Sequence, residues 1–188
     1  MDKRLEIIEA AKKAFRQYGI FKTTLDDVAS NCKIKKNALY YYFKNKEELF
    51  RAAIHSEFET LLNEENMKNA DNQDFGAFLR NFFLMRYNEG TRFISEYDLM
   101  RYESQQIYHH IFHEETEFLL EEEQKILHFI IKDKVSTDTD LESLITMLVS
   151  INQGLLYKSL FSHKKSDNIE KEINTIVNYL LNGIKLKT

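Results

Sequence analysis

Hydrophobic residues recur every three or four positions through most of the chain, which is the spacing of one face of an α-helix. The first such stripe lies within residues 3–18 and consists of Leu5, Ile8, Ala11, Ala14, Phe15 and Tyr18. Gly19 follows where a left-handed residue would end the helix, and Asp2 precedes it as a candidate cap. We therefore predict an N-terminal helix whose solvated side carries the cations Arg4, Lys12, Lys13 and Arg16.

The following stretch, from Thr23 to Phe50, predicts two short helices, a tight turn and the start of a third helix. Thr24 and Asp27 have the spacing of an N-cap hydroxyl and its N3 acid, which satisfy free helix N–H groups. Asn45 and Glu48 repeat that spacing at the start of the third helix. Two short helices joined by a tight turn form a helix-turn-helix, in which the second helix enters the DNA major groove.

The second short helix carries residue types that suit DNA. Lysines are attracted to phosphates, asparagine pairs with two groups on a base edge, and tyrosines supply hydroxyl donors and ring area. We expect phosphate contacts from Thr24, Tyr42 and Lys46, and base-edge contacts from Lys36, Asn37, Ala38 and Tyr41. Lys35 and Tyr40 complete the candidate DNA-binding residues. The alternative is a pair of surface helices in an ordinary bundle, with solvated lysines.

The spacing Leu-Tyr-x-x-Phe-x-x-Lys-x-x-Leu, here LYYYFKNKEEL at residues 39–49, is the most specific motif of the chain. It is accompanied by Phe15, Gly19, Thr23, Thr24, Val28, Ala29, Ile34 and Phe50. On these residues the first quarter of the sequence resembles the TetR family of transcriptional regulators. The resemblance implies a ligand-released repressor that binds a palindromic operator as a homodimer. It also implies a helix-turn-helix head, placed at residues 1–46, and a helical ligand-binding and dimerisation domain, placed at residues 47–188.

Three positions depart from the usual pattern of that family. Lys33 stands where the turn usually has glycine, Lys35 where a serine usually caps the second helix, and Asn37 where glycine is common. A lysine in a left-handed turn costs about 1 kcal/mol relative to glycine, and a lost hydroxyl cap costs a similar ~1 kcal/mol. The added cations should raise non-specific DNA affinity and its salt dependence. Tyr40, by the resemblance, packs against the head as often as it contacts DNA.

Apolar stripes continue to the end of the chain. They predict helices from residue 46 to about 67, over 75–87, 93–102 and 104–133, from 139 to about 161, and over 169–184. Residues 88–90 (Asn-Glu-Gly) are expected to end the helix over 75–87, and residues 68–73 to form a loop. Thr139 with Glu142, and Asp167 with Glu170, have the spacing of capping pairs. With no proline and 5 glycines, the chain is predicted to be all-α with about nine helices.

Aromatic and methionine side chains in the middle of the chain are candidates for a ligand pocket, because apolar pockets between bundle helices often bind small molecules. They are Phe78, Phe82, Tyr87, Tyr97, Met100, Tyr108 and Phe112. The alternative is that they form plain core. The resemblance implies that the last two long helices pair with those of a second copy. The expected interface residues are Leu148, Ile151, Leu155, Ile173, Ile176, Val177 and Leu180, unless that stripe only closes the core of the subunit.

The overall charge of −4 hides an uneven distribution. Residues 1–56 hold 12 Lys/Arg and 7 Asp/Glu, whereas residues 57–188 hold 14 and 23. A basic first segment with an acidic remainder is expected when one end of a protein meets nucleic acid. The single cysteine excludes an internal disulfide, the charged start is unlike a signal peptide, and no apolar run approaches the ~20 residues of a membrane span. We therefore expect a cytoplasmic protein.

The segment HHIFHEETE is a candidate of another kind, because it places His109, His113 and Glu117 on one helical face. Imidazoles at this spacing bind Zn²⁺, Ni²⁺ or Cu²⁺, so a metal-responsive sensor is an alternative function. We favour the plainer interpretation of a polar outer face without metal. The chain lacks an HExxH pattern, a nucleophile signature and a glycine-rich phosphate loop, so we expect neither an enzyme nor a cofactor. An architectural DNA binder without a ligand is the remaining alternative.

Overall fold

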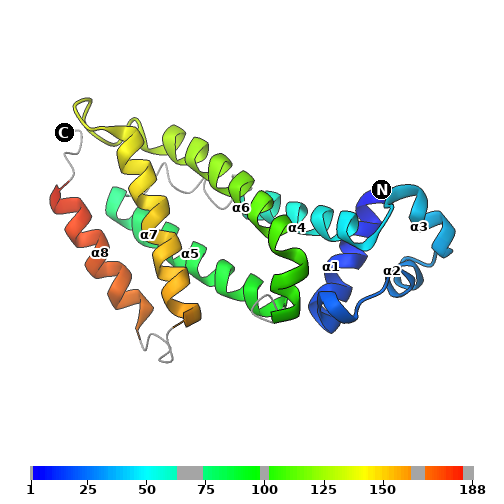
Figure 1. The fold of residues 1–188 in the computed structure, drawn as a ribbon. Coiled ribbons are helices and arrows are strands. Elements are labelled where there is room, and N and C mark those ends of the chain that lie inside the picture. The colour runs from blue at the N-terminus through cyan, green and yellow to red at the C-terminus, as the bar shows by residue number, and fades with distance from the viewer. Residues whose placement is uncertain (1, 63–73, 98–101, 162–167, 184–188) are drawn as a thin grey trace. The chain divides into compact units, whose positions relative to one another are not determined.

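The computed structural model describes residues 2–62, 74–97, 102–161 and 168–183, and of these all side chains except those of 102–109, 160 and 161. The described part is all-α, as predicted (Figure 1). Its helices are α1 (Lys3–Lys22), α2 (Leu25–Asn31), α3 (Lys36–Tyr42), α4 (Lys46–Leu62), α5 (Phe75–Glu96), α6 (Tyr102–Ile131), α7 (Leu141–Phe161) and α8 (Ile169–Gly183). The predicted loop at residues 68–73 lies outside the described residues.

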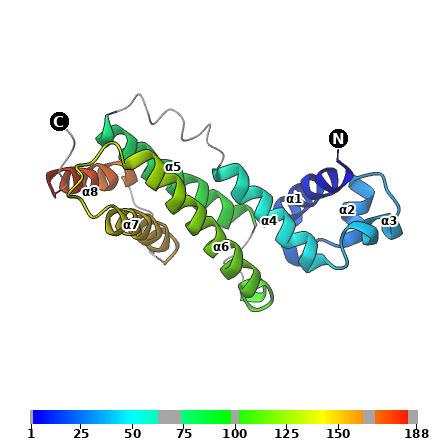
Figure 2. The ribbon, with the colours of Figure 1, turned by 90° about the horizontal axis from the view of Figure 1, so that it is seen from above.

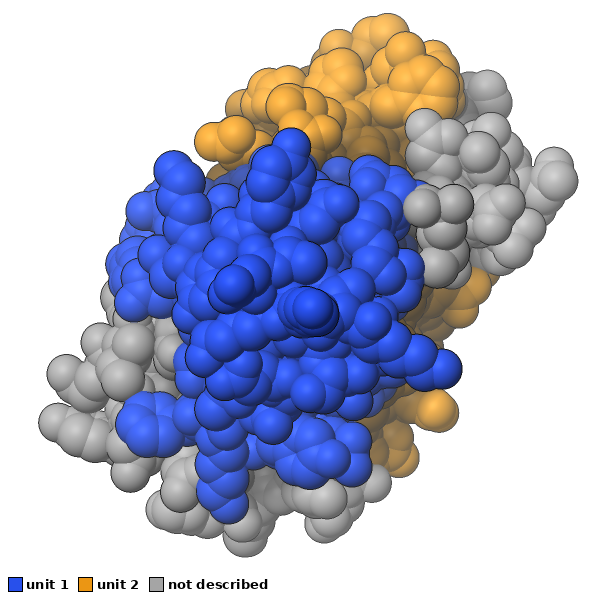
Figure 3. All heavy atoms as spheres, turned by 90° about the vertical axis from the view of Figure 1, so that its right-hand side faces the viewer, with its two compact units in different colours: residues 1–61, 92–119 blue, residues 62–91, 120–188 orange. Residues whose placement is uncertain are grey.

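The chain divides into two compact units, which Figure 3 colours separately. Unit 1 comprises Met1–Leu61 and Arg92–Leu119, and unit 2 comprises Leu62–Thr91 and Leu120–Thr188. Helices α5 and α6 therefore contribute residues to both units. This division does not test the expected boundary between residues 46 and 47, which stays a prediction.

Helix α5 runs without interruption through Asn88, Glu89 and Gly90. The predicted break is wrong, and the two helices expected around it are one, which leaves eight described helices instead of about nine. The reason is packing. A Cβ at Gly90 would lie 3.0 Å from both Cδ atoms of Leu156, so the glycine lets α5 and α7 approach closely instead of ending a helix.

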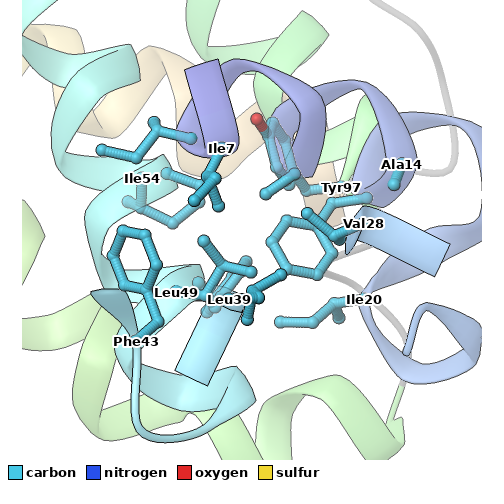
Figure 4. Packing of buried hydrophobic residues seen from close by; sticks show 14 of the residues in the cluster. Ile7, Ala14, Ile20, Val28, Leu39, Phe43, Leu49, Ile54 and Tyr97 are labelled. Carbon is cyan, nitrogen blue, oxygen red and sulfur yellow. The ribbon is translucent and has the colours of Figure 1, made fainter. Parts of the chain in front are cut away.

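The core of unit 1 is built by one face of each of the helices α1 to α4, together with Phe93, Tyr97 and Ile111. In Figure 4 the buried side chains of Ile7 (α1), Val28 (α2), Leu39 (α3) and Leu49 (α4) point toward one another. All four are fully buried. Burial of apolar surface of this kind contributes about 25 cal/mol per Å² and is what holds helices as short as α2 and α3 in place.

Helix α1 departs from the predicted stripe at its two ends. Leu5 and Tyr18 are exposed by 52% and 50%, whereas Ile7, which the stripe omitted, is fully buried. Gly19 has φ +76 and ψ 153, which side-chain-bearing residues rarely adopt. It therefore kinks α1 and does not end it at residue 18 as predicted, since the helix resumes to Lys22.

The first two capping pairs are confirmed. Thr24 and Asp27 form a reciprocal capping box at the start of α2. Asn45 caps α4, since its Oδ1 accepts from the Glu48 N–H at 2.8 Å. Asp2 likewise caps α1 by accepting from the Arg4 N–H at 2.9 Å.

The two later capping predictions are each wrong by one residue. Helix α7 is capped by Asp140, whose Oδ1 accepts from the Ser143 N–H at 3.1 Å, and not by Thr139. Helix α8 is capped by Asn168, whose Oδ1 accepts from the Lys171 N–H at 2.9 Å. In both places two adjacent residues are of types that suit an N-cap, so the sequence alone does not distinguish between them.

The core of unit 2 is formed by α5, α7, α8 and the second part of α6. Figures 1 and 2 both place α7 and α8 side by side, and Lys158 Nζ donates to Glu172 Oε1 at 2.6 Å between them. The fully buried members of this core include Leu79, Phe83, Leu127, Leu148 and Val177. Among the described helices none is long and apolar enough to cross a membrane.

Candidate DNA-binding site

The turn between α2 and α3 contains the left-handed residue that the sequence predicts. Lys33 has φ +54, the one positive φ of a non-glycine residue in the described part of the chain. Its N–H donates to Ser30 O at 3.0 Å, and the N–H of Ile34 donates to Ala29 O at 3.0 Å. These bonds end α2 and redirect the chain into α3. The turn has this form at a cost of about 1 kcal/mol relative to glycine.

Helix α3 begins without a side-chain cap, also as predicted. Lys35 occupies the N-cap position with extended backbone angles and makes no capping hydrogen bond. Lys35 and Lys36 are both exposed. The start of α3 therefore presents two cations to solvent in place of a hydroxyl cap, an arrangement that attracts a phosphate backbone.

Helix α3 is anchored by one face and exposed on the other. Leu39 and the C-cap residue Phe43 are fully buried, and Tyr42 packs partly against the same core. The exposed residues are Lys36, Asn37, Ala38, Tyr40 and Tyr41. Tyr41 is 85% exposed, and its ring meets the ring of Tyr42 edge-on with centroids 5.3 Å apart. The four base-edge candidates thus share one solvent-facing side of a short, well-anchored helix.

Lys36 already has an anionic partner in the protein. Its Nζ donates to Asp26 Oδ2 at 2.7 Å, which joins the first turns of α2 and α3. This hydrogen bond and the charge of Asp26 raise the pKa of Lys36. Because both groups are exposed, salt screens the pair and a DNA phosphate can compete with Asp26 for the ammonium.

Thr24 uses its hydroxyl within the capping box. The hydroxyl donates to Asp27 Oδ2 at 2.7 Å and accepts from the Asp27 N–H at 3.2 Å. The bond from the Thr24 hydroxyl and a second one from the Thr24 N–H, both to Asp27 Oδ2, lower the pKa of Asp27 because they favour the carboxylate. For Thr24 to donate its hydroxyl proton to a phosphate, the hydrogen bond from that hydroxyl to Asp27 would have to break.

The ammonium group of Lys46 makes hydrogen bonds within the protein that the sequence did not predict. Its Nζ donates to the carbonyl oxygens of Ile20, Phe21 and Thr23 at 2.8, 3.2 and 3.0 Å, which engages all three ammonium protons. Partial burial lowers the pKa of Lys46. The lysine therefore ties the start of α4 to the end of α1. No local sequence pattern could predict these hydrogen bonds, because the carbonyl groups lie 23 to 26 residues upstream of Lys46.

A buried carboxylate fixes α1 on α4. Glu57 is 6% exposed and accepts hydrogen bonds from Arg16 and, at 3.2 Å, from the Tyr97 hydroxyl, while Lys12 Nζ lies 3.3 Å away. Arg16 Nε also lies 3.1 Å from Glu96 Oε2, as an ion pair without hydrogen-bond geometry. Burial and the charge of Glu57 raise the pKa of Tyr97 far above its ordinary value. We refer to these five residues as the Glu57 cluster.

The Glu57 cluster corrects one prediction. Lys12 is 7% exposed and lies against Glu57, so its placement on the solvated side of α1 is wrong. The cause is a carboxylate far along the sequence, which offsets the cost of burying the ammonium. The cluster sets where α1 sits on α4, and thereby helps to position the helices that precede α3.

Residues 7–53, which contain the whole helix-turn-helix and the capping residues around it, match the family of bacterial regulatory proteins described as the tetR family. Along the whole chain, a transcriptional regulator from Cytophaga hutchinsonii has a similar structure, with a TM-score of 0.71 and 27% identity over 98% of this chain and 100% of that one. The chain belongs to the TetR family. It is a helix-turn-helix, DNA-binding transcriptional regulator, and the family is one of regulators and not of enzymes.

Curated relatives of this TetR-family protein include longer and shorter matches. The negative transcriptional regulator IcaR of the biofilm operon icaADBC, from Staphylococcus epidermidis, is 24% identical over 159 residues, or 85% of each chain. The HTH-type regulator YhgD of Bacillus subtilis is 44% identical over 68 residues, or 36% of this chain and 34% of that one. The higher identity is thus confined to a shorter segment.

The predicted pocket residues of the TetR-family chain do not lie in one cluster. Phe78 and Phe82 are buried in the core of unit 2, with ring centroids 6.2 Å apart, and Tyr87 packs partly against that core. Tyr97 and Phe112 belong to the core of unit 1. Met100 lies outside the described residues, and the side chain of Tyr108 is also not described. Membership of a shared pocket stays a prediction.

The predicted dimer stripe is largely internal to unit 2. Leu148, Leu155, Ile173 and Val177 are buried in its core, and Ile151, Ile176 and Leu180 pack partly against it. Other apolar residues of α7 and α8 are exposed instead, namely Met147 by 40%, Tyr157 by 65% and Tyr179 by 77%. A single apolar stripe cannot distinguish an internal face from an interface, so the sequence did not indicate that these three side chains are exposed.

The histidine segment contains an ion pair within α6. His113 Nδ1 lies 3.5 Å from Glu117 Oε1, and both side chains are exposed. Among the described side chains no three His, Cys, Asp or Glu residues are grouped as a metal site, although the side chain of His109 is not described. Cys32, by contrast, is buried at the end of α2, and burial raises the pKa of its thiol.

Proposed function

We propose that this TetR-family regulator is a repressor that binds a near-palindromic operator as a homodimer and leaves it when a small molecule binds its C-terminal domain. Each α3 would enter the major groove of one half-site. The half-sites would be about one helical turn (~34 Å), or a multiple of it, apart. As a regulator of transcription, the protein would act in the cytoplasm.

The observation that carries the proposal is the exposed face of α3. Lys36, Asn37 and Tyr41 extend from a helix that is fixed to the core through Leu39 and Phe43. A side chain reads a base edge only if its backbone is held still, and burial of the opposite face provides that support. The matched segment and the basic excess of residues 1–56 support the same assignment.

Repression is supported by the names of the relatives. The Staphylococcus epidermidis relative is a negative regulator of the biofilm operon, and an Escherichia coli relative, 45% identical over 47 residues, is described as a probable operon repressor. By analogy, we propose that the present chain also represses transcription. The residues proposed to contact DNA are those predicted from the sequence, with Lys46 now also a structural link between α1 and α4.

Dimerisation is supported by the exposed side of α7 and α8. Met147, Tyr157 and Tyr179 leave large apolar side chains at the surface beside the core of unit 2. Tyrosines favour interfaces because they bury a large ring while keeping a hydroxyl for hydrogen bonds. We propose that a second copy covers these residues, together with the partly buried Ile176 and Leu180.

Selection of bound duplexes from a random pool, followed by a salt titration, tests the proposal. We expect a near-palindromic consensus bound by two chains. The logarithm of the binding constant should fall steeply with the logarithm of the salt concentration, by about 0.9 per phosphate contacted. An asymmetric consensus bound by one chain would contradict the dimer, and no enrichment at all would contradict sequence-specific repression.

A further inference from the structure

Unit 2 buries two polar side chains and one polar atom of a third at positions where its helices otherwise carry apolar residues. They are Arg86 on α5, Glu123 on α6 and Asn152 on α7. Each lies one helical turn from a buried residue on the same face of its own helix, namely Phe82, Leu127 and Leu148. A polar group at such a position is costly unless a partner satisfies it.

Arg86 and Glu123 satisfy each other only in part. Their side chains are 4% and 2% exposed, and Arg86 Nε donates to Glu123 Oε1. The second guanidinium nitrogen, Nη2, is buried without a hydrogen-bond partner in the protein. A buried donor left in this state lowers the stability of the fold until an acceptor reaches it. The ion pair therefore holds a guanidinium in the interior with both N–H groups of Nη2 still without an acceptor.

Asn152 contributes a buried acceptor atom that is likewise unsatisfied. Its Oδ1 is buried and has no hydrogen-bond partner in the protein. Gly90 and Leu156 are in close contact between α5 and α7, and Arg86 and Asn152 each lie one turn before them. Figure 1 shows α5 and α7 running in the same general direction. The unused donor and the unused acceptor thus belong to the same stretch of the α5–α7 packing.

The face of α5 that carries Arg86 is aromatic in its earlier turns. Phe78, Phe82, Arg86 and Gly90 follow one another at intervals of four residues, which places them in one row along the helix. The rings of Phe75, Phe78 and Phe82 stack in succession, with centroids 6.3 and 6.2 Å apart. A molecule that reached Arg86 along this row would contact aromatic rings with its remaining surface.

We propose that Arg86, Glu123 and Asn152 form the polar end of the effector site, an inference that rests on the proposed ligand response. The effector is a neutral, mostly aromatic molecule. A carbonyl oxygen of this molecule accepts from Arg86 Nη2, and a hydroxyl or N–H group donates to Asn152 Oδ1. Neutrality follows because Glu123 already balances the charge of Arg86, so a bound anion would leave a net charge buried.

Calorimetric titration of the purified full chain, without DNA, tests the inference with four small arenes. Meta-hydroxyacetophenone carries both the acceptor and the donor, meta-methoxyacetophenone lacks the donor, meta-ethylphenol lacks the acceptor, and meta-hydroxybenzoate is an anion. We expect meta-hydroxyacetophenone to bind at least tenfold more tightly than each of the others. Equal binding of the four compounds, tightest binding of the anion or no binding at all would overturn the inference.

Two variants locate the site. Asn152→Leu removes the acceptor without changing charge, and the double change Arg86→Met with Glu123→Leu replaces the ion pair by apolar groups, which interiors often tolerate. Both should weaken meta-hydroxyacetophenone binding at least tenfold, whereas Gln153→Leu, at an exposed neighbouring position on α7, should leave it unchanged. Equal affinity in all proteins would mean that ordered water serves the buried polar atoms, and would overturn the inference.

The ligand titration is separate from the test of repression. A chain that discriminates the four compounds as expected but enriches no duplex would contradict the proposed repression alone. A chain that binds its selected operator but shows no preference among the compounds would contradict the effector site alone.

Discussion

Two lysines next to α3 occupy positions at which another residue type would make the folded protein more stable. Lys33 adopts a left-handed conformation that favours glycine, and Lys35 sits at an N-cap without supplying a cap. Each costs about 1 kcal/mol, which is a noticeable fraction of the 5–15 kcal/mol by which domains are stable. Both place a cation beside α3, so the sequence at this point exchanges stability for attraction to DNA.

The substitution Lys33→Gly tests this exchange. It should raise the free energy of unfolding by about 1 kcal/mol, because glycine relieves the strain at positive φ. Urea denaturation measures the change, and Lys33→Ala, which removes the cation but keeps the Cβ, serves as the control and should give no such gain. Both variants should bind non-specific duplexes more weakly with a shallower salt dependence. A loss of stability in Lys33→Gly would show that the lysine side chain supports the turn.

At the scale of helices, features that depend on neighbouring residues could be predicted from the sequence. Features that depend on contacts between helices could not. The Thr24–Asp27 box could be predicted because its hydrogen bonds join residues three apart. The continuity of α5 could not, because Gly90 is explained by its contact with Leu156 on another helix. Only the folded chain reveals that Lys46 binds the end of α1.

The same distinction applies to the candidate sites. The exposed face of α3 was predictable because a short helix with Leu39 and Phe43 on one side leaves the other side to solvent. An apolar stripe on α7 or α8 does not indicate whether its residues face the core of the subunit or a second chain, because both environments require the same residue types. The Glu57 cluster was invisible to pattern reasoning because its members come from three helices that are distant in sequence.

The Glu57 cluster gives a prediction at this scale. Glu57→Gln removes the anion shared by Arg16, Lys12 and the Tyr97 hydroxyl, and leaves two cations close together. We expect the free energy of unfolding to fall by about 2 kcal/mol or more, which is less than for a fully buried pair because Arg16 remains partly exposed. Denaturant unfolding measures this. Tyr97→Phe, which deletes one buried donor, should cost about 1 kcal/mol.

The control for these two variants is Glu122→Gln, which breaks the exposed pair between Glu122 and Lys125 on α6. Screening by water and salt makes such a pair contribute little, so its loss should leave stability nearly unchanged. If Glu57→Gln were as stable as this control, the cluster would not be what fixes α1 on α4.

At the scale of the whole molecule, charge and fold assign separate roles to the two ends of the chain. The first 56 residues carry the excess of Lys and Arg and the helix-turn-helix, whereas the remainder is acidic. An acidic remainder repels DNA and helps to orient the basic end toward it. We propose that α3 reads the sequence of the DNA that the basic end attracts.

The most direct test of that claim compares Asn37→Ala with the unmodified chain on two duplexes, the selected operator and a scrambled one of equal length, by fluorescence anisotropy at one salt concentration. The exposed Asn174→Ala on α8 is the matched control. An asparagine that pairs with a base edge contributes about 1–3 kcal/mol, so Asn37→Ala should bind the operator roughly five- to 150-fold more weakly and the scrambled duplex equally well. Unchanged operator affinity, or an equal loss on both duplexes, would contradict sequence readout by Asn37 on α3.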